Sequence, residues 1–309
     1  NFKGVIKYGL FPKPHYFIKD TAINYDEKNL GKANITKIYI LIKNFFSLDN
    51  LKIKDLNFKQ TEFDINSNNF IFFEKVLNAN KSDFNINFFD SKLFYKDKFE
   101  DVIFLTKIKD LNFLYTDDFK QQLNIELNIF NIPFKMNVLN DLEKKNTIIE
   151  LESHKLRLKI KNNFDYNEKN INGFLDFKII NKSKVIKYDA NKNSLSFNTD
   201  ENNFKGKIDF KPFYMSSDLK FYQIDIMQIF KDNSIFLNIL NTEIFNNQNL
   251  NSVINIYSDK FKDVNYLSDI NLKVYFEEGD IKIKNSSLNW KNSILINLDE
   301  VELINQNNN

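Results

Sequence analysis

The chain has 309 residues and no cysteine, and its 43 basic residues nearly balance 41 acidic ones. The absence of cysteine excludes disulfides, cysteine-ligated metal sites and thiol catalysis. Nucleic-acid binding is not expected, because it favours a concentrated, arginine-rich basic stripe, whereas the charges here are interleaved and Arg157 is the only arginine. Asparagine (50) and phenylalanine (33) are abundant and glycine (6) is scarce, a skew that we attribute to AT-rich codons.

No run of apolar residues approaches the roughly 18 that a membrane-spanning helix needs, and no signal-peptide pattern is present. The densest apolar run is residues 38–42. The sequence opens inside a strand-like pattern, from Gly4 to Tyr8. We therefore expect a fragment of a longer chain that has lost an N-terminal segment.

Alternation of apolar and polar residues dominates the first part of the chain. A period of two places the apolar side chains on one face of a strand and the polar ones on the other. The sets occur in chain order at Ile38, Ile40 and Ile42; Leu51 and Ile53; Leu56 and Phe58; Phe63 and Ile65; Phe84 and Ile86; and Val102, Phe104 and Ile108.

Residues 123–138 give the clearest pattern. A break at Phe130 and Asn131 separates two alternating stretches. We predict two strands joined by a tight turn, with one apolar and one polar face. The apolar positions are Leu123, Ile125, Leu127 and Ile129, followed by Ile132, Phe134, Met136 and Val138.

The C-terminal part predicts a meander of strands. Its first turn contains Gly279, which suits unusual turn angles. Strands joined by such short polar turns are antiparallel neighbours. The sets before the meander are Leu156, Leu158 and Ile160; Phe177 and Ile179; Leu195 and Phe197; and Ile208 and Phe210, and those within it are Leu272, Val274 and Phe276; Ile281 and Ile283; Leu288 and Trp290; and Ile294, Ile296 and Leu298.

Three short segments have helical spacing, namely residues 69–77, 226–230 and 234–245. Ser234 would be the N-cap of the third. We expect these helices to cover an open end or edge of the sheet.

The expected fold is mainly β, a long, strongly twisted and curled antiparallel sheet that forms an elongated β-groove with a few short helices. About sixteen strands would make a sheet that curls. Residues 1–220 would form the N-terminal part of the groove, 221–250 a helical segment that caps or covers the sheet, and 251–309 the continuing meander, all in one continuous domain. A two-sheet sandwich would show the same alternation and stays open as an alternative.

No catalytic constellation, cofactor motif or metal-ligand spacing is present. The two histidines, His15 and His154, lie far apart in the chain, and we expect no metal. Paired carboxylates at residues 117–118 and 277–278 fit solvated turns better than a glycosidase pair. Trp290 beside Lys291 is interpreted as a packing residue.

Two short motifs carry a resemblance to a known family. Residues 4–14, GVIKYGLFPKP, and the turn at residues 130–134, FNIPF, resemble features of AsmA-like proteins, the AsmA and TamB group of the bacterial envelope. The meander at residues 278–292 is also similar to the C-terminal part of that family.

The resemblance implies an inner-membrane anchor upstream of this chain and a β-groove on the periplasmic side. It implies passage of phospholipid towards the outer membrane, or outer-membrane assembly more broadly, with envelope proteins as further partners. We thus expect a non-enzymatic lipid conduit whose groove binds phospholipid acyl chains through Leu123, Ile125, Leu127, Ile129, Phe134, Met136, Leu272, Val274, Phe276, Ile281, Ile294 and Ile296.

Two other functions stay open. The first alternative is a structural or adhesive module, a β-sandwich or fibre unit whose apolar face is closed by a second sheet. The second is an enzyme that acts on envelope glycans.

Overall fold

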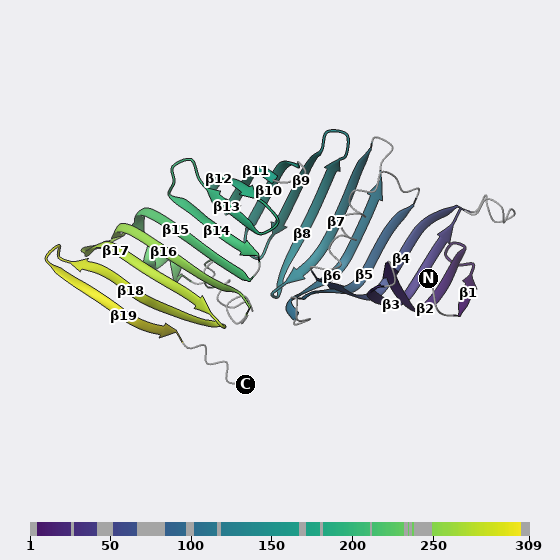
Figure 1. The fold of residues 1–309 in the computed structure, drawn as a ribbon, viewed down its shortest axis with the longest axis horizontal. Helices are drawn as coiled ribbons and strands as arrows, with labels where there is room; N and C mark the ends of the chain where they lie inside the picture. The colour runs from purple at the N-terminus through teal and green to yellow at the C-terminus, as the bar shows by residue number, and fades with distance from the viewer. Residues whose placement is uncertain are drawn as a thin grey trace. The chain divides into compact units, whose positions relative to one another are not determined.

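The computed structural model describes residues 5–25, 28–41, 52–66, 84–96, 102–115, 119–166, 171–179, 182–210, 212–231, 234, 237 and 249–303 (Figure 1). Nineteen strands and one short helix lie within these ranges. The chain forms two compact units, Asn1–His154 and Lys155–Asn309. The domain boundaries expected near residues 220 and 250 both fall inside the second unit.

The first unit is one sheet of nine strands that pair in chain order. Seven of the eight neighbouring pairs are antiparallel, and β4 and β5 are parallel. The strands are β1 (Ile6–Gly9), β2 (His15–Tyr25), β3 (Lys28–Ile40), β4 (Ile53–Ile65), β5 (Asn85–Lys96), β6 (Val102–Tyr115), β7 (Lys120–Ile129), β8 (Ile132–Asp141) and β9 (Asn146–Ser153).

The predicted hairpin at residues 123–138 is confirmed as β7 and β8. Ile129 pairs with Ile132 across the turn. The two turn residues, Phe130 and Asn131, have φ of 50° and 61°. Positive φ at both central positions is the geometry of a two-residue turn whose twist matches that of the flanking strands.

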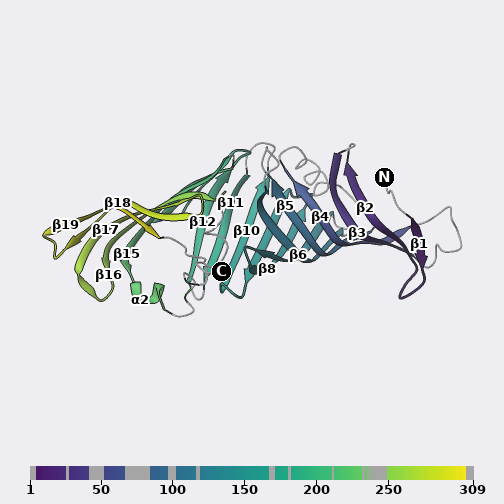
Figure 2. The ribbon, with the colours of Figure 1, turned by 90° about the horizontal axis from the view of Figure 1, so that it is seen from below.

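The strands of the first unit bend along their length (Figure 2). Three of them contain a residue with positive φ, namely Asp20 (50°), Gln60 (50°) and Asp90 (48°). The next residue in each strand is small and buried: Thr21, Thr61 and Ser91. We call these six residues the bend line.

The residues of the bend line on β2, β4 and β5 lie next to one another across the sheet, with Ala33 of β3 between the first two. Thr21 and Thr61 both pair with the buried Ala33 of β3, and the Thr61 N–H donates to Ser91 Oγ at 3.2 Å. Side chains converge on the inside of a bend, where only small ones fit. The strands therefore bend toward the face that carries Thr21, Thr61 and Ser91.

The second unit is a sheet of ten strands that also pair in chain order. All of its neighbouring pairs are antiparallel except β15 and β16. The strands are β10 (Leu158–Tyr166), β11 (Ile171–Ile179), β12 (Lys182–Ala190), β13 (Ser194–Asn198), β14 (Phe204–Phe210), β15 (Phe213–Ile224), β16 (Asn251–Phe261), β17 (Val264–Glu277), β18 (Asp280–Trp290) and β19 (Ile294–Leu303).

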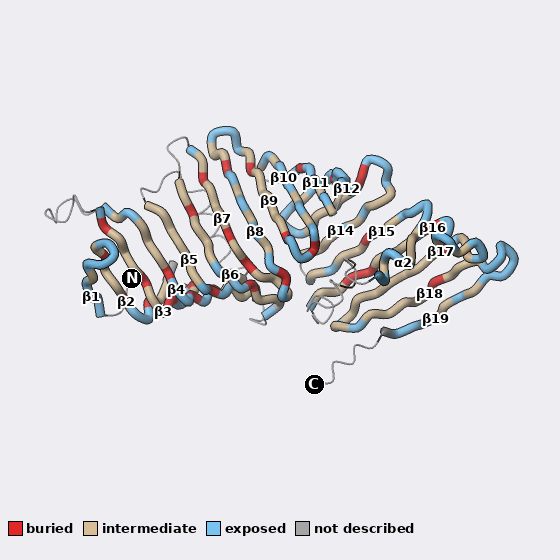
Figure 3. The backbone as a smooth tube through the Cα atoms, turned by 180° about the vertical axis from the view of Figure 1, so that it is seen from behind, coloured by how far each residue is buried: buried red, intermediate tan, exposed pale blue. Residues whose placement is uncertain are grey.

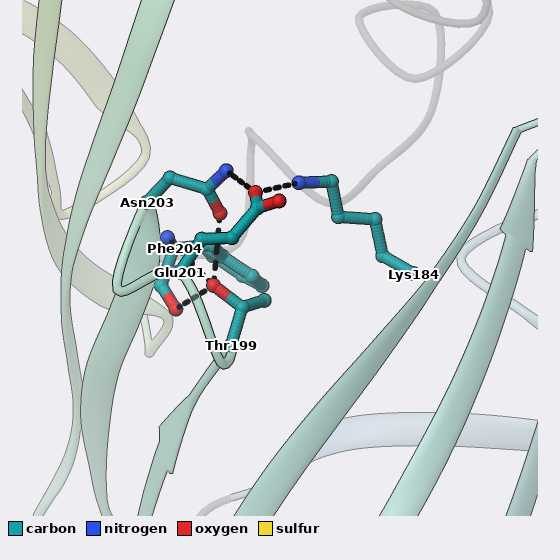
Figure 4. Close-up of polar contacts among 5 residues, drawn as sticks. All are labelled: Lys184, Thr199, Glu201, Asn203 and Phe204. Carbon is teal, nitrogen blue, oxygen red and sulfur yellow. Dashed lines mark hydrogen bonds and ion pairs between the residues drawn. The ribbon is translucent and has the colours of Figure 1, made fainter.

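Side chains tie the turn between β13 and β14 together (Figure 4). Thr199 Oγ1 donates to Asn203 Oδ1 at 2.8 Å, and Asn203 in turn donates to the Glu201 carboxylate. Lys184 from β12 reaches the same carboxylate at 3.2 Å. The turn is thus linked to the strand on the far side of β13.

The two parallel pairs correct the expectation of a purely antiparallel sheet. Parallel neighbours need a long crossover connection, and the connections at residues 66–84 and 225–250 are the long ones in each unit. Both coincide with segments that have helical spacing in the sequence.

The predicted helix at residues 226–230 is confirmed as α2 (Ile226–Ile229), capped by the Asp225 side chain, which accepts from the Gln228 N–H at 3.1 Å. Residues 69–77 lie outside the described residues. Of residues 234–245 only Ser234 and Leu237 are described, and the Leu237 N–H donates to Ser234 Oγ at 3.1 Å, as an N-cap would require. The mainly-β class with a curled sheet is confirmed.

Candidate functional site

The apolar face of the first unit contains all six groove residues predicted there. The buried core of this face is formed by Ile108, Ile125 and Leu127. Partly buried side chains pack around it: Leu93, Leu111, Leu123, Ile129, Phe134 and Met136. Ile108, Leu93 and Leu111 were not among the predicted site residues.

Cross-strand pairing extends this face over all nine strands. Side chains directly opposite each other in a sheet share a face. One row of directly paired residues takes one residue from each of the nine strands, and Thr36 is its single polar member. The row consists of Ile6, Ile18, Thr36, Phe58, Phe88, Leu111, Ile125, Met136 and Leu151.

The second unit has a comparable face. Pairing places Leu272, Val274 and Phe276 opposite residues of β16, and Ile281 opposite Phe276. One row crosses all ten strands: Tyr166, Ile171, Ala190, Leu195, Ile208, Met215, Ser252, Phe276, Ile281 and Leu303.

Ile294 and Ile296 lie at a less regular place. They pair with Trp290 and Leu288 on β18, beyond the two register shifts between β17 and β18. Ile294 is 52% exposed. The structure thus brings four of the six predicted residues of this unit together on neighbouring strands and places these two at its last strand.

Much of both apolar faces is half-buried rather than enclosed (Figure 3). Within the described residues, the strands of each unit belong to one sheet. Neither unit taken by itself is the two-sheet sandwich considered from the sequence.

The polar face of the first unit carries a row of asparagines. Asn57, Asn87, Asn112, Asn124 and Asn137 occupy directly paired positions on β4 to β8. Asn87 Nδ2 donates to Asn57 Oδ1 at 2.7 Å, and Asn112 donates to Asn87. We call this row the asparagine ladder.

Two hollows lie on the same polar face. One, of about 770 Å³, is lined by Tyr39, Phe89 and ladder members among others. The second, of about 500 Å³, lies toward Pro133 and His154. Both share Asp90, Lys109, Glu126 and Lys135.

The shared residues include an ion-pair triad. The Glu126 carboxylate lies 3.0 Å from Lys109 Nζ and 3.2 Å from Lys135 Nζ. The hydrogen bond from Lys109, followed by that from Lys135, lowers the pKa of Glu126. The three side chains of the triad line both hollows.

The histidines do not form a site. His15 is buried, its Nδ1 lies 2.8 Å from the Lys13 carbonyl oxygen, and its ring lies 5.2 Å from that of Tyr39. His154 Nδ1 lies 3.7 Å from the Glu152 carboxylate in an exposed position. No group of three or more potential metal ligands occurs among the described residues.

The linings of the two hollows include none of Trp290, Lys291, Glu277 and Glu278. Trp290 is 39% exposed and has the Lys291 ammonium over its ring at 5.5 Å. The carboxylate pair at residues 117–118 lies outside the described residues. Glu277 and Glu278 lie at the turn between β17 and β18.

No protein-family model matches the chain, and no curated protein matches it. Within the described residues, no helix combines the length and the apolar character that a membrane crossing demands.

The asparagine ladder and the hollows were not found from the sequence. The ladder members alternate with apolar residues in five strands, which is a visible signal. Their alignment, however, depends on register between strands. The bend line could have been noticed in the sequence. At each of its positions a polar residue is followed by threonine or serine, and there the alternation of apolar and polar residues shifts by one position.

Proposed function

We propose that this chain is a non-enzymatic lipid-binding segment whose apolar faces hold acyl chains. The observation that carries the proposal is the pair of apolar rows, which cross nine and ten strands; four side chains of the first row and seven of the second are half-buried. A soluble protein seldom leaves a large apolar surface uncovered without a binding role.

The energetics suit a sliding ligand. An acyl chain gains about 0.8 kcal/mol for each methylene that leaves water. Each apolar row offers similar binding positions on successive strands, so an acyl chain can move along the face without returning to water. A charged headgroup would remain in solvent at the margin of the face, because burying it unpaired is costly.

We extend the proposal to an envelope role on the basis of the resemblance at residues 4–14 and 130–134. In that role the chain is a lipid-conduit segment of an AsmA-like protein on the periplasmic side of a bacterial inner membrane. Its ligand would be phospholipid on the way to the outer membrane, and envelope proteins would be further partners.

Photo-crosslinking in cells tests the proposal. Met136 and Val274 lie on the apolar faces, and their chain neighbours Asn137 and Lys273 lie on the opposite faces. A photoreactive residue at Met136 or Val274 should capture phospholipid, detected by mass spectrometry of the purified adduct. Capture equal to or weaker than that from Asn137 and Lys273 would refute the lipid-binding function.

A further inference from the structure

The polar face of the first unit has the features of a second binding site, separate from the apolar face. Its larger hollow, of about 770 Å³, is in the size range of ligand sites. We infer that this hollow and the asparagine ladder bind a linear, hydroxyl-rich polymer, that is, a glycan strand.

The ladder supplies both kinds of hydrogen-bonding group. Each asparagine amide has two N–H donors and an oxygen with two lone pairs. Asn87 and Asn112 use one donor each within the ladder, which leaves further donors and acceptors for a ligand. Sugar hydroxyls also both donate and accept hydrogen bonds. They therefore match a row of amides better than ligands that can only donate or only accept.

The spacing of the ladder suits a polymer. Its amides recur at the distance between neighbouring strands, about 4.8 Å, which is close to the length of one sugar unit in an extended chain. Four members are half-buried and Asn137 is exposed. The row is therefore accessible and nearly periodic over five strands.

Aromatic rings lie beside the ladder. Tyr39 on β3 and Phe89 on β5 both line the larger hollow. Pairing places Lys37, next but one to Tyr39, beside the first ladder residue, Asn57. An aromatic face packs against the apolar face of a sugar ring, as it does against other C–H surfaces.

The lining disfavours two other classes of polymer. Asp90, Asp110 and Glu126 line the same hollow together with Lys37, Lys59, Lys109 and Lys135. Its charges nearly cancel, whereas binding to nucleic-acid phosphates draws on an excess of positive charge. A peptide strand binds by adding to a sheet edge, whereas Asn87, Asn112 and Asn124 lie on strands with neighbours on both sides.

NMR-monitored titration of the full chain with chitohexaose and with cellohexaose tests the inference. The variant Asn124→Ala/Asn137→Ala removes two ladder amides that line the hollow. Its matched control is Asn271→Ala/Asn297→Ala, which removes one half-buried and one exposed asparagine from strands of the second unit. Tyr39→Leu is a second variant, which removes an aromatic ring and leaves the ladder intact.

At least one hexasaccharide should bind saturably to the unmodified chain. Loss of two hydrogen bonds should weaken that binding roughly tenfold in Asn124→Ala/Asn137→Ala, and Tyr39→Leu should weaken it as well. The control should bind like the unmodified chain.

The inference is overturned if neither hexasaccharide binds, if both variants retain full affinity, or if the control loses as much affinity as they do. Competition by a single-stranded oligonucleotide at equal concentration would also overturn it, in favour of nucleic acid. Lipid capture at Met136 and Val274 concerns the opposite face, so either result can fail without the other.

Discussion

The two units share a plan but differ in how closely their apolar faces are packed. Each has antiparallel strands interrupted by one parallel pair. Of the sixteen buried apolar side chains among the described residues, eleven belong to the first unit, including Ile108, Ile125 and Leu127. Within the same described residues, the second unit contributes most of the exposed large apolar side chains, such as Phe221 and Trp290.

The difference separates two demands on an apolar face. Close packing stabilises a sheet but leaves less surface for a ligand, whereas a looser face offers surface at the expense of stability. The first unit should therefore contribute more to folding stability, and the second should be the easier place for a lipid to enter.

The largest expected effect compares one substitution in both units. Leu127→Ala removes a buried member of the core cluster, and we expect a loss of about 3 kcal/mol in the free energy of unfolding. Leu272→Ala removes a half-buried side chain and should cost about 1 kcal/mol. Urea unfolding measures both.

Equal losses from the two leucine substitutions would contradict the proposed difference in packing. Asn128→Ala, adjacent to Leu127 but on the polar face, controls for general disturbance of β7.

A smaller effect concerns serines that act alike in both units. Ser91 Oγ accepts from the Thr61 N–H at 3.2 Å and donates to the Phe89 carbonyl at 3.0 Å. Ser286 Oγ accepts from the Lys273 N–H at 2.9 Å and donates to the Lys284 carbonyl at 3.2 Å. Each follows a residue with φ of about 50°, Asp90 or Asn285.

Ser91→Ala and Ser286→Ala should each cost about 2 kcal/mol, because a backbone N–H within the sheet loses its acceptor. Chemical denaturation of each variant checks this value. The contrasting control is Thr61→Val, since the buried Thr61 hydroxyl has no hydrogen-bond partner; its replacement by a methyl should gain about 1 kcal/mol. A loss in that variant would show that the hydroxyl is satisfied.

Local pattern predicted the parts of the fold where alternation is uninterrupted. In β7 and β8 the apolar residues keep one phase from Leu123 to Val138, so strands, turn and faces could all be predicted. In β4 the alternation of apolar and polar residues is interrupted at Gln60, which has positive φ. The sequence of this one strand therefore showed two separate alternating sets, Leu56 with Phe58 and Phe63 with Ile65.

Features that depend on register could not be predicted in the same way. The asparagine ladder needs five strands to align, and pairing is a long-range property of the sheet. The abundance of asparagine also pointed to codon usage rather than to a site. The parallel pairs were missed because short turns elsewhere suggested antiparallel neighbours throughout.

The smallest expected effect compares two carboxylates, one in each unit. Hydrogen bonds from Lys109 and Lys135 lower the pKa of Glu126. A hydrogen bond from Lys262, and then one from the Gln228 N–H, lower the pKa of Asp225. A carboxyl whose pKa is lower in the folded state stabilises the protein above its unfolded pKa, and this contribution is lost as the pH falls through the folded pKa.

Glu126→Gln and Asp225→Asn should therefore each flatten the decline in unfolding free energy below the ordinary carboxyl pKa of about 4, measured by urea titration from about pH 6 to about pH 3. Molar salt should abolish the contribution of Glu126, because both of its partners are exposed lysines. Part of the Asp225 contribution should persist in salt, because a backbone N–H at the start of α2 also binds the carboxylate. Equal salt sensitivity of the two would mean that the helix cap adds nothing to the lysine pair.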